Sequence, residues 1–142
     1  MKSIILSLGL ALRVFITQGQ ESNDNTNLKA LQVVQEQLDA YNARDIDRFM
    51  EVFSDSVKFV DFKTTKLSIA GKEEVRKRFT AYFEASPNLK SSLAGRIHFD
   101  NVVIDHEKIT GSRGSDALFE IVMVYELNEA GKIFRASSIR KN

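Results

Sequence analysis

Apolar residues recur at steps of three and four along three stretches between residues 28 and 83. Such spacing predicts amphipathic helices, the first of about four turns beginning at Leu28. Asp45 is a good N-cap for the second helix, and Gly71 opens the third, which ends at Ser86-Pro87-Asn88. The predicted buried stripes are Leu28, Leu31, Val34, Leu38 and Tyr41, then Ile46, Phe49, Met50 and Phe53, then Val75, Phe79, Tyr82 and Phe83.

Segments of alternating or β-branched residues predict strands elsewhere in the chain. They cover residues 57–62, 67–69, 93–99, 102–110, 117–127 and 132–140. Because short connections join the last four segments, we expect them to form an antiparallel meander. Three N-terminal helices followed by such strands predict an α+β fold, in which the helices pack in a strongly curved antiparallel sheet.

The strand predicted at 117–127 is apolar on both faces. One face is apolar throughout, and the other mixes valines with Glu120 and Glu126. A sheet that is apolar on both sides requires a cover on each. The helices provide one cover, so we expect a homodimer through the outer face, over a flat patch of Val122, Val124, Ala136 and Ser138.

Residues 1–19 have the outline of a secretory signal peptide. Lys2 gives a basic start, the run from Ile4 to Leu12 is apolar, and small residues follow at plausible cleavage positions. The run is too short to span a bilayer, so we expect no membrane attachment after cleavage and a periplasmic or secreted location. Arg13 interrupts the apolar stretch, and the alternative is an amphipathic N-terminal helix packed on a cytoplasmic domain.

The polar segment 20–27 is expected to be a flexible leader, which leaves one domain at 28–142. The chain carries 20 basic and 19 acidic residues, a balance that argues against a nucleic-acid partner. It has no cysteine, which excludes disulfides, thiolate metal sites and a cysteine nucleophile. Phosphate-binding glycine loops, zinc-protease helices and nucleophile elbows are also missing.

Asp61 is the first candidate for acid–base chemistry. Strand parity places it on one face with Val57 and Phe59. A carboxylate among apolar neighbours loses hydration, which raises its pKa and suits it to proton abstraction. The alternative is a carboxylate at the end of a strand, hydrogen-bonded to the following loop.

The tripeptide Asp105-His106-Glu107 has chemically active side chains, but strand geometry separates them. Alternate residues point to opposite faces, so these three cannot form one metal site, and we expect no metal site in this chain. His106 is the second candidate acid or base of a pocket, since imidazole titrates near neutrality. It could equally be a half-buried histidine that pairs with Glu120, a further candidate pocket residue, across the hairpin.

Several segments in order resemble the nuclear transport factor 2-like superfamily, which includes the SnoaL-like polyketide cyclases and the ketosteroid isomerases. The resemblance covers about residues 30–140 and implies a cone, a bent sheet wrapped around helices with a pocket at its open end. Members isomerise steroids, cyclise polyketides, open epoxides or only bind proteins, so the fold alone does not give the function. The resembling segments are Val33-Val34-Gln35, Asn42-Ala43, Asp45, Asp47, Phe53, Asp55, the strand from Val57 to Asp61, Gly71-Lys72-Glu73-Glu74-Val75, Val103 to Gly111 and Glu120 to Leu127.

The resemblance places Asp61 at the general-base aspartate of the ketosteroid isomerases. Gln37 stands where those enzymes have a tyrosine, and Met123 where they have a protonated aspartate. Losing such an oxyanion-hole donor costs about 3–4 kcal/mol of transition-state stabilisation, which argues against steroid isomerisation. Tyr41 and Tyr125 are candidate replacement donors, and the alternative is that both are core tyrosines.

The sequence therefore predicts an exported SnoaL-like pocket protein that binds or acts on a small apolar molecule. If it is an enzyme, Asp61 and His106 are its expected catalytic groups, and no cofactor is needed because acid–base chemistry supplies the activation. The alternative is a non-catalytic module for ligand binding or protein assembly. The remaining candidate pocket residues are Gln37, Tyr41, Phe59, Phe119, Glu120, Met123 and Tyr125.

Overall fold

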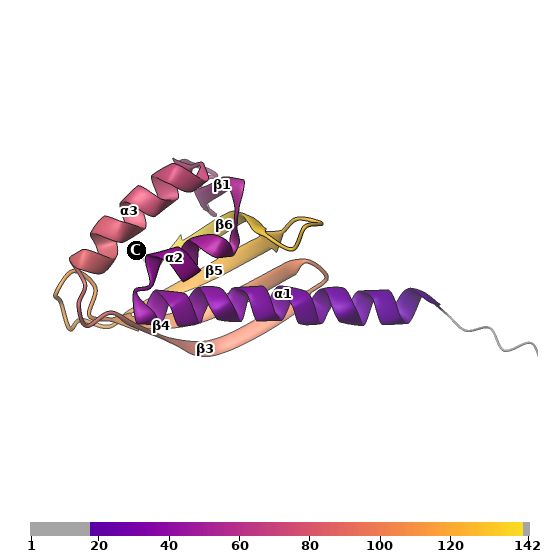
Figure 1. Ribbon diagram of the computed structural model, residues 1–142. Helices are drawn as coiled ribbons and strands as arrows, with labels where there is room; N and C mark the ends of the chain where they lie inside the picture. The colour runs from indigo at the N-terminus through magenta and orange to yellow at the C-terminus, as the bar shows by residue number, and fades with distance from the viewer. Residues whose placement is uncertain (1–17, 141–142) are drawn as a thin grey trace, which may run out of the picture.

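A computed structural model describes residues 18–140 of the protein, and the side chains of residue 25 and of residues 27–140 (Figure 1). Three helices pack on one face of a curved six-stranded sheet, which confirms the predicted α+β fold. The helices and strands are α1 (Gln18–Ala43), α2 (Ile46–Glu51), β1 (Phe53–Asp61), β2 (Leu67–Ala70), α3 (Lys72–Glu84), β3 (Lys90–Phe99), β4 (Val102–Thr110), β5 (Phe119–Leu127) and β6 (Ile133–Arg140).

The strand order across the sheet is β2-β1-β6-β5-β4-β3. Strands β3 to β6 form the expected antiparallel meander. Strand β1 pairs with β6 in parallel, an arrangement that the sequence pattern did not predict. Parallel neighbours need a crossover connection, and here everything from β2 to β5 lies between the two strands in the chain. The first and last strands of the fold thus meet in the middle of the sheet.

Helix α1 is longer than its apolar stripe predicts. It begins at Gln18, and the structure continues it through residues 20–27, where the sequence analysis placed a flexible leader. Residues 20–27 contain no glycine or proline, so nothing there breaks the backbone hydrogen bonding. In Figure 1 the N-terminal turns of α1 extend past the hairpin of β3 and β4.

No helix within residues 18–140 is long and apolar enough to cross a membrane.

The second helix is shorter than predicted, because Phe53 begins β1 and does not belong to the helix. Asp45 is its N-cap, as predicted, and its carboxylate accepts a hydrogen bond of 3.1 Å from the backbone N–H of Arg48. Gly71, at the N-cap of α3, has a φ of 87°, a left-handed value that glycine adopts without strain.

Aromatic rings hold the three helices together. Phe49 of α2 is fully buried, and its ring centroid lies 4.6 Å from that of Phe79 and 5.5 Å from that of Phe83, both on α3. Tyr41 of α1 meets Phe83 edge-on at 5.6 Å. Burying each large apolar side chain contributes about 1.5–3 kcal/mol, so this cluster fixes α3 against α1 and α2. The rest of α3 is thereby held over the concave face of the sheet.

The two faces of the sheet differ in burial. On β5, Ile121, Met123 and Tyr125 are buried on the concave face, and Val122 and Val124 are partly buried on the convex face. Two of the four residues expected in the outer-face patch for dimerisation lie on the other face of the sheet. Ala136 and Ser138 lie directly opposite Tyr125 and Met123, so both belong to the concave face. The convex neighbours of the two valines on β6 are Ser137 and Ile139.

Candidate functional site

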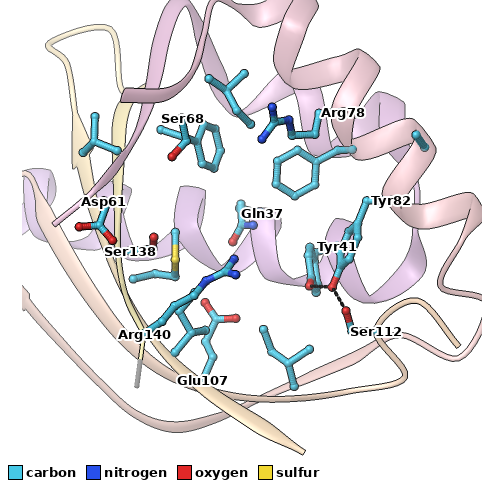
Figure 2. A pocket seen from close by; sticks show the side chains of 18 of the residues that line it. Gln37, Tyr41, Asp61, Ser68, Arg78, Tyr82, Glu107, Ser112, Ser138 and Arg140 are labelled. Atoms are coloured by element: carbon cyan, nitrogen blue, oxygen red, sulfur yellow. Dashed lines mark hydrogen bonds between the residues drawn. The ribbon is translucent and has the colours of Figure 1, made fainter. Parts of the chain in front are cut away.

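A cavity of about 1330 Å³ lies between α1, α3 and the concave face of the sheet (Figure 2). Gln37 and Tyr41 reach it from α1, and Glu107 and Tyr125 reach it from the sheet. These four residues are buried and form its closed end. Exposed residues of α3, together with the ends of β1 and β6, form its mouth toward solvent. The volume is large enough to hold a small organic molecule.

Glu107 is the buried carboxyl group of the closed end. It is 5% exposed, and its Oε2 accepts a hydrogen bond of 2.6 Å from the Ser91 hydroxyl. Its Oε1 accepts a weaker bond of 3.3 Å from the hydroxyl of Tyr125. Burial, with a smaller contribution from nearby Asp105, raises the pKa of Glu107 above its ordinary value of 4.5, although both hydroxyl donors act in the opposite direction. A carboxyl group whose pKa is raised in this way holds its proton more tightly than an exposed one and is a candidate for proton transfer.

The position of Ser91 is set by the end of α1. Asn42 donates from Nδ2 to the backbone carbonyl of Ser91 at 2.9 Å, and its Oδ1 accepts from the Ser91 N–H at 2.7 Å. This pair of bonds fixes β3 against the last turn of α1. The Ser91 hydroxyl is consequently held against Glu107.

Asp105 is the other buried carboxylate on the concave face of β4, and its surroundings differ from those of Glu107. It has no exposed surface, and both its oxygens accept bonds of 2.6 Å from the Arg96 guanidinium. Arg96 also donates to Gln35 of α1 at 2.8 Å. Such a bidentate pair compensates the buried charge. Glu107 has only neutral hydroxyl donors, so of the two it is the group free to exchange a proton.

A chain of hydroxyl groups joins α1, α3 and the loop after β4. The hydroxyl of Tyr41 lies 3.2 Å from that of Tyr82, which donates to Ser112 at 3.0 Å. Because Tyr82 has one proton and gives it to Ser112, Tyr41 is the donor in the first bond. Burial is the main cause that raises the pKa of Tyr41, and its hydrogen bond with Tyr82 adds to it. Tyr41 therefore keeps its proton and acts as a hydrogen-bond donor.

Asp61 lines the cavity, but at its mouth and not at its closed end. It is the last residue of β1, and its Oδ1 accepts bonds of 2.8 Å from both the backbone N–H and the hydroxyl of Thr64. These bonds lower the pKa of Asp61 below its ordinary value of 3.8. The expectation of a raised pKa is therefore wrong, because a loop supplies donors where the sequence suggested apolar neighbours. The structure shows the alternative arrangement, a strand-end carboxylate bonded to its loop.

His106 is not among the residues that line this cavity. It lies on the convex face of the sheet, where its Nε2 is 2.6 Å from Oε2 of Glu120. Both side chains are about two-fifths exposed, at 43% and 40%. The expectation that His106 is an acid or base of this pocket is wrong, because strand alternation sends it to the face opposite Glu107, and the structure shows the alternative, a half-buried histidine paired with Glu120. Glu120 likewise does not line the main cavity.

The other predicted pocket residues, Gln37, Tyr41, Phe59, Phe119, Met123 and Tyr125, all line the cavity. Sequence reasoning missed Glu107, Ser91, Tyr82, Ser112 and Arg140 as site residues. For Glu107 a signal existed, because it shares a strand face with Val103 and Ile109, both buried. Within residues 18–140 no three histidine, aspartate or glutamate side chains gather as a metal site would require.

Comparison with protein families gives one match. The model of the SnoaL-like domain family matches residues 34–136, which is more than half of the chain. The chain belongs to the SnoaL-like domain family. A comparison with curated proteins finds no match.

Solved structures share the fold of this SnoaL-like domain at low sequence identity. An uncharacterized cystatin fold protein from Novosphingobium aromaticivorans is 24% identical, with a TM-score of 0.71 over 78% of this chain and 97% of its own. A candidate ketosteroid isomerase from Kribbella flavida is 13% identical, with a TM-score of 0.70 over 82% of this chain and 80% of its own. A candidate SnoaL-like polyketide cyclase from Jannaschia sp. CCS1 is 14% identical, with a TM-score of 0.69 over 80% and 86%. At these identities the similarity establishes the fold alone.

Proposed function

We propose that this SnoaL-like domain binds a small, largely apolar molecule in its cavity and transfers a proton to or from it with Glu107, without a cofactor. The observation that carries the proposal is the Glu107 carboxyl group, buried at the closed end of the cavity between two hydroxyl donors. Its pKa is raised by burial, which brings it toward the pH at which a group serves as both acid and base.

The chemistry follows from this arrangement. As a base, the Glu107 carboxylate removes a C–H proton next to a carbonyl group, and the electron pair moves into the carbonyl to form an enolate. As an acid, the same group returns the proton to another carbon or to the oxygen. Ser91 and Tyr125 donate hydrogen bonds to Glu107 and stabilise its carboxylate form, which is present before the first step and is restored by the second. Isomerisation of an enone and cyclisation through a new carbon–carbon bond both begin with such a transfer, and in a hydrolysis the same base would instead remove a proton from the attacking water.

The names of two fold relatives agree with this reaction class. One is a candidate ketosteroid isomerase and the other a candidate polyketide cyclase. Here Gln37 and Met123 occupy the positions at which the resemblance expects the isomerase donors, so the substrate is proposed to differ from a steroid enone.

Exchange of α-protons tests the proposal without knowledge of the natural substrate. The protein is incubated in D₂O with 2-tetralone or 2-decanone, and the loss of the α-proton signal is followed by NMR. We expect the native protein to accelerate exchange and Glu107→Gln to lose about 10²–10⁴-fold of that acceleration. Glu126→Gln is the matched control, because Glu126 pairs with Arg135 on the convex face.

Two outcomes contradict the assignment of Glu107. The first is full exchange activity in Glu107→Gln, with a folded variant confirmed by its NMR spectrum. The second is loss of exchange in Asp61→Asn with retention in Glu107→Gln. That result would make Asp61, at the mouth of the cavity, the group that transfers the proton.

A second candidate function is ligand binding without catalysis. It is favoured by one observation: the hydroxyls of Tyr41, Tyr82 and Tyr125 are all engaged with protein partners, so none is held ready for an oxyanion. Under this hypothesis the ketones bind and shift the resonances of cavity residues, but the native protein exchanges their α-protons no faster than buffer does.

We further propose a homodimer through the convex face of the sheet. Val122, Val124 and Ile139 form a partly buried apolar strip there, and Ile97 and Phe99 on β3 extend it with 65% and 84% of their surface exposed. A stable interface should bury at least about 1,000 Å² in total. Sedimentation should show a dimer that Val124→Glu dissociates, and a native monomer at micromolar concentration contradicts the proposal.

Export is the remaining part of the proposal. Its support is the sequence pattern of residues 1–19, of which residues 1–17 lie outside the described part of the chain. Mass spectrometry of the protein from its own host should find a chain that lacks this segment. A chain that begins at Met1 contradicts export by this route.

A further inference from the structure

The charged side chains that line the cavity are not balanced. Lysine and arginine contribute four of them, Lys77, Arg78, Arg113 and Arg140, and the carboxyl groups are Asp61, Glu74 and Glu107. The Asp61 carboxylate is bound to Thr64, and burial shifts Glu107 toward its neutral form. The lining therefore sets four cations against the Asp61 and Glu74 carboxylates and the buried Glu107 carboxyl group. A concave site of one sign concentrates ligands of the other sign.

Two arginines of the cavity lining, Arg78 and Arg140, have no side-chain partner within the part of the chain that the structure describes. Among the described residues, neither the Arg78 nor the Arg140 guanidinium forms an ion pair or a side-chain hydrogen bond, whereas Arg76, also on α3, binds Asp47 at 2.7 Å outside the cavity. In Figure 2 the Arg140 side chain reaches from the end of β6 over Glu107 toward Gln37. Arg140 is exposed, and its guanidinium presents a planar pair of donors, which matches a carboxylate.

Gln37 supplies an independent observation. Its side chain is 6% exposed and lines the cavity, and its Oε1 has no hydrogen-bond partner. A buried acceptor without a donor is costly, so such an atom points to a group that the bound state supplies. A hydroxyl or N–H on a ligand beside Arg140 would satisfy it.

The remaining walls of the cavity are apolar. Phe59, Phe79, Phe119, Ile121 and Met123 surround the space between the polar groups. We propose that the ligand is a hydroxylated organic acid with an apolar body, whose carboxylate binds Arg140 and whose hydroxyl donates to Gln37 Oε1, while Arg78 attracts the anion at the mouth. This inference rests on the proposed small-molecule function and names its ligand class.

A series of naphthalene compounds isolates each contact. Dissociation constants are measured by NMR titration for 2-naphthol, 2-naphthoate, 6-hydroxy-2-naphthoate and 2-naphthyl sulfate. We expect 2-naphthoate to bind about tenfold more tightly than 2-naphthol, as one charge-assisted contact allows, and the hydroxylated acid to bind more tightly still. Tighter binding of the sulfate than of the carboxylate overturns the assignment of a carboxylic acid.

Variants assign the contacts to residues. Arg140→Gln should remove the tenfold advantage of 2-naphthoate, Arg140→Lys should keep part of it, and Arg76→Gln, the matched control on α3, should leave it unchanged. Gln37→Met should remove the advantage of the added hydroxyl and retain that of the carboxylate. If Arg140→Gln or Gln37→Met leaves its advantage intact, the corresponding contact is disproved.

The same titrations separate this inference from the proposed function. If 2-naphthol binds as tightly as the acids and shifts the cavity resonances, the cavity takes small molecules but does not select anions, so the inference falls and the proposed function stands. If no compound, charged or neutral, shifts the resonances of the cavity residues, both fall.

Discussion

The closed end and the mouth of the cavity each hold a carboxyl group, and the two groups behave in opposite ways. Glu107 lies in the middle of β4, beneath α1, where the hydroxyls of Ser91 and Tyr125 donate hydrogen bonds to its carboxyl group. Asp61 lies at the last position of β1, where the following loop turns back and Thr64 donates two hydrogen bonds to it. Burial raises the pKa of the first, and the donors lower the pKa of the second.

This difference shows how position along a strand governs the chemistry of a side chain. A residue in mid-strand on the concave face is covered by a helix and loses water, and its neighbours' backbone groups are already paired within the sheet. A residue at a strand end faces a loop whose N–H groups are still available. The same functional group is thus a proton-transfer candidate in one place and a loop anchor in the other.

The largest expected effect on the free energy of unfolding concerns the buried ion pair of Arg96 and Asp105. Arg96→Ala leaves Asp105 buried without its partner, which should cost about 3–5 kcal/mol of unfolding free energy. Arg76→Ala breaks the exposed pair with Asp47 and should cost at most about 1 kcal/mol. Urea denaturation measures both values. Equal losses in the two variants would mean that Asp105 is not excluded from water.

The next effect concerns Glu107 and the pH dependence of stability. Its pKa in the folded state exceeds that in the unfolded state, so the folded state binds the proton more tightly. The contribution of Glu107 to the free energy of unfolding should be fully present below about pH 4.5, its ordinary pKa, and be lost as the pH rises toward the folded pKa, by about 1.4 kcal/mol for each pH unit between the two pKa values.

Glu107→Gln removes this titration. The variant should therefore gain stability relative to the native protein as the pH rises from 4 to 8, which denaturation at several pH values measures. A difference between the two proteins that does not change with pH would show that Glu107 is hydrated and that the contrast with Asp61 does not exist.

The smallest effect concerns Asp61. Its pKa is lowered by folding, so its stabilising contribution is present above the ordinary value of 3.8 and is lost as the pH falls through the folded pKa. Asp61→Asn should be slightly less stable than the native protein at pH 7 and equally stable at the lowest pH. Acid denaturation followed by circular dichroism checks this. If Asp61→Asn were more stable than the native protein at pH 7, Asp61 would be a desolvated group, as the sequence analysis expected.

Much of the fold was accessible from the sequence, because local spacing determines it. The stripe that includes Val34, Leu38 and Tyr41 marks α1, and Asp45 marks the start of α2. Six of the pocket residues also line the cavity, since their parity on a strand or helix selects a face. The pairing of β1 with β6 was not accessible, because no local pattern records which distant strands become neighbours.

The chemistry of the site was harder to predict for two physical reasons. The pKa of Asp61 depends on Thr64, a loop residue whose hydrogen bonds appear only once the turn has formed. Arg140 contributes through a long side chain at the end of β6, and its direction depends on the surrounding walls. His106 was chosen as a candidate because of its residue type. Strand alternation would have selected Glu107, which lies on the face that the helices cover.

The parallel pairing of β1 with β6 has a consequence for how the chain is made. Strand β6 lies between β1 and β5, so the β1–β2 edge has no neighbour to join until Ile133–Arg140 has left the ribosome. During synthesis, the α1–β1–β2–α3 segment and the β3–β5 meander cannot pair with each other before β6 is made. Each of them has an uncovered apolar face until then. Assembly that depends on contacts so distant in the chain is slow, and partly synthesised chains expose unpaired strand edges to aggregation. Strand β6 also carries Arg140, so the cavity acquires this cation at the moment when the sheet closes.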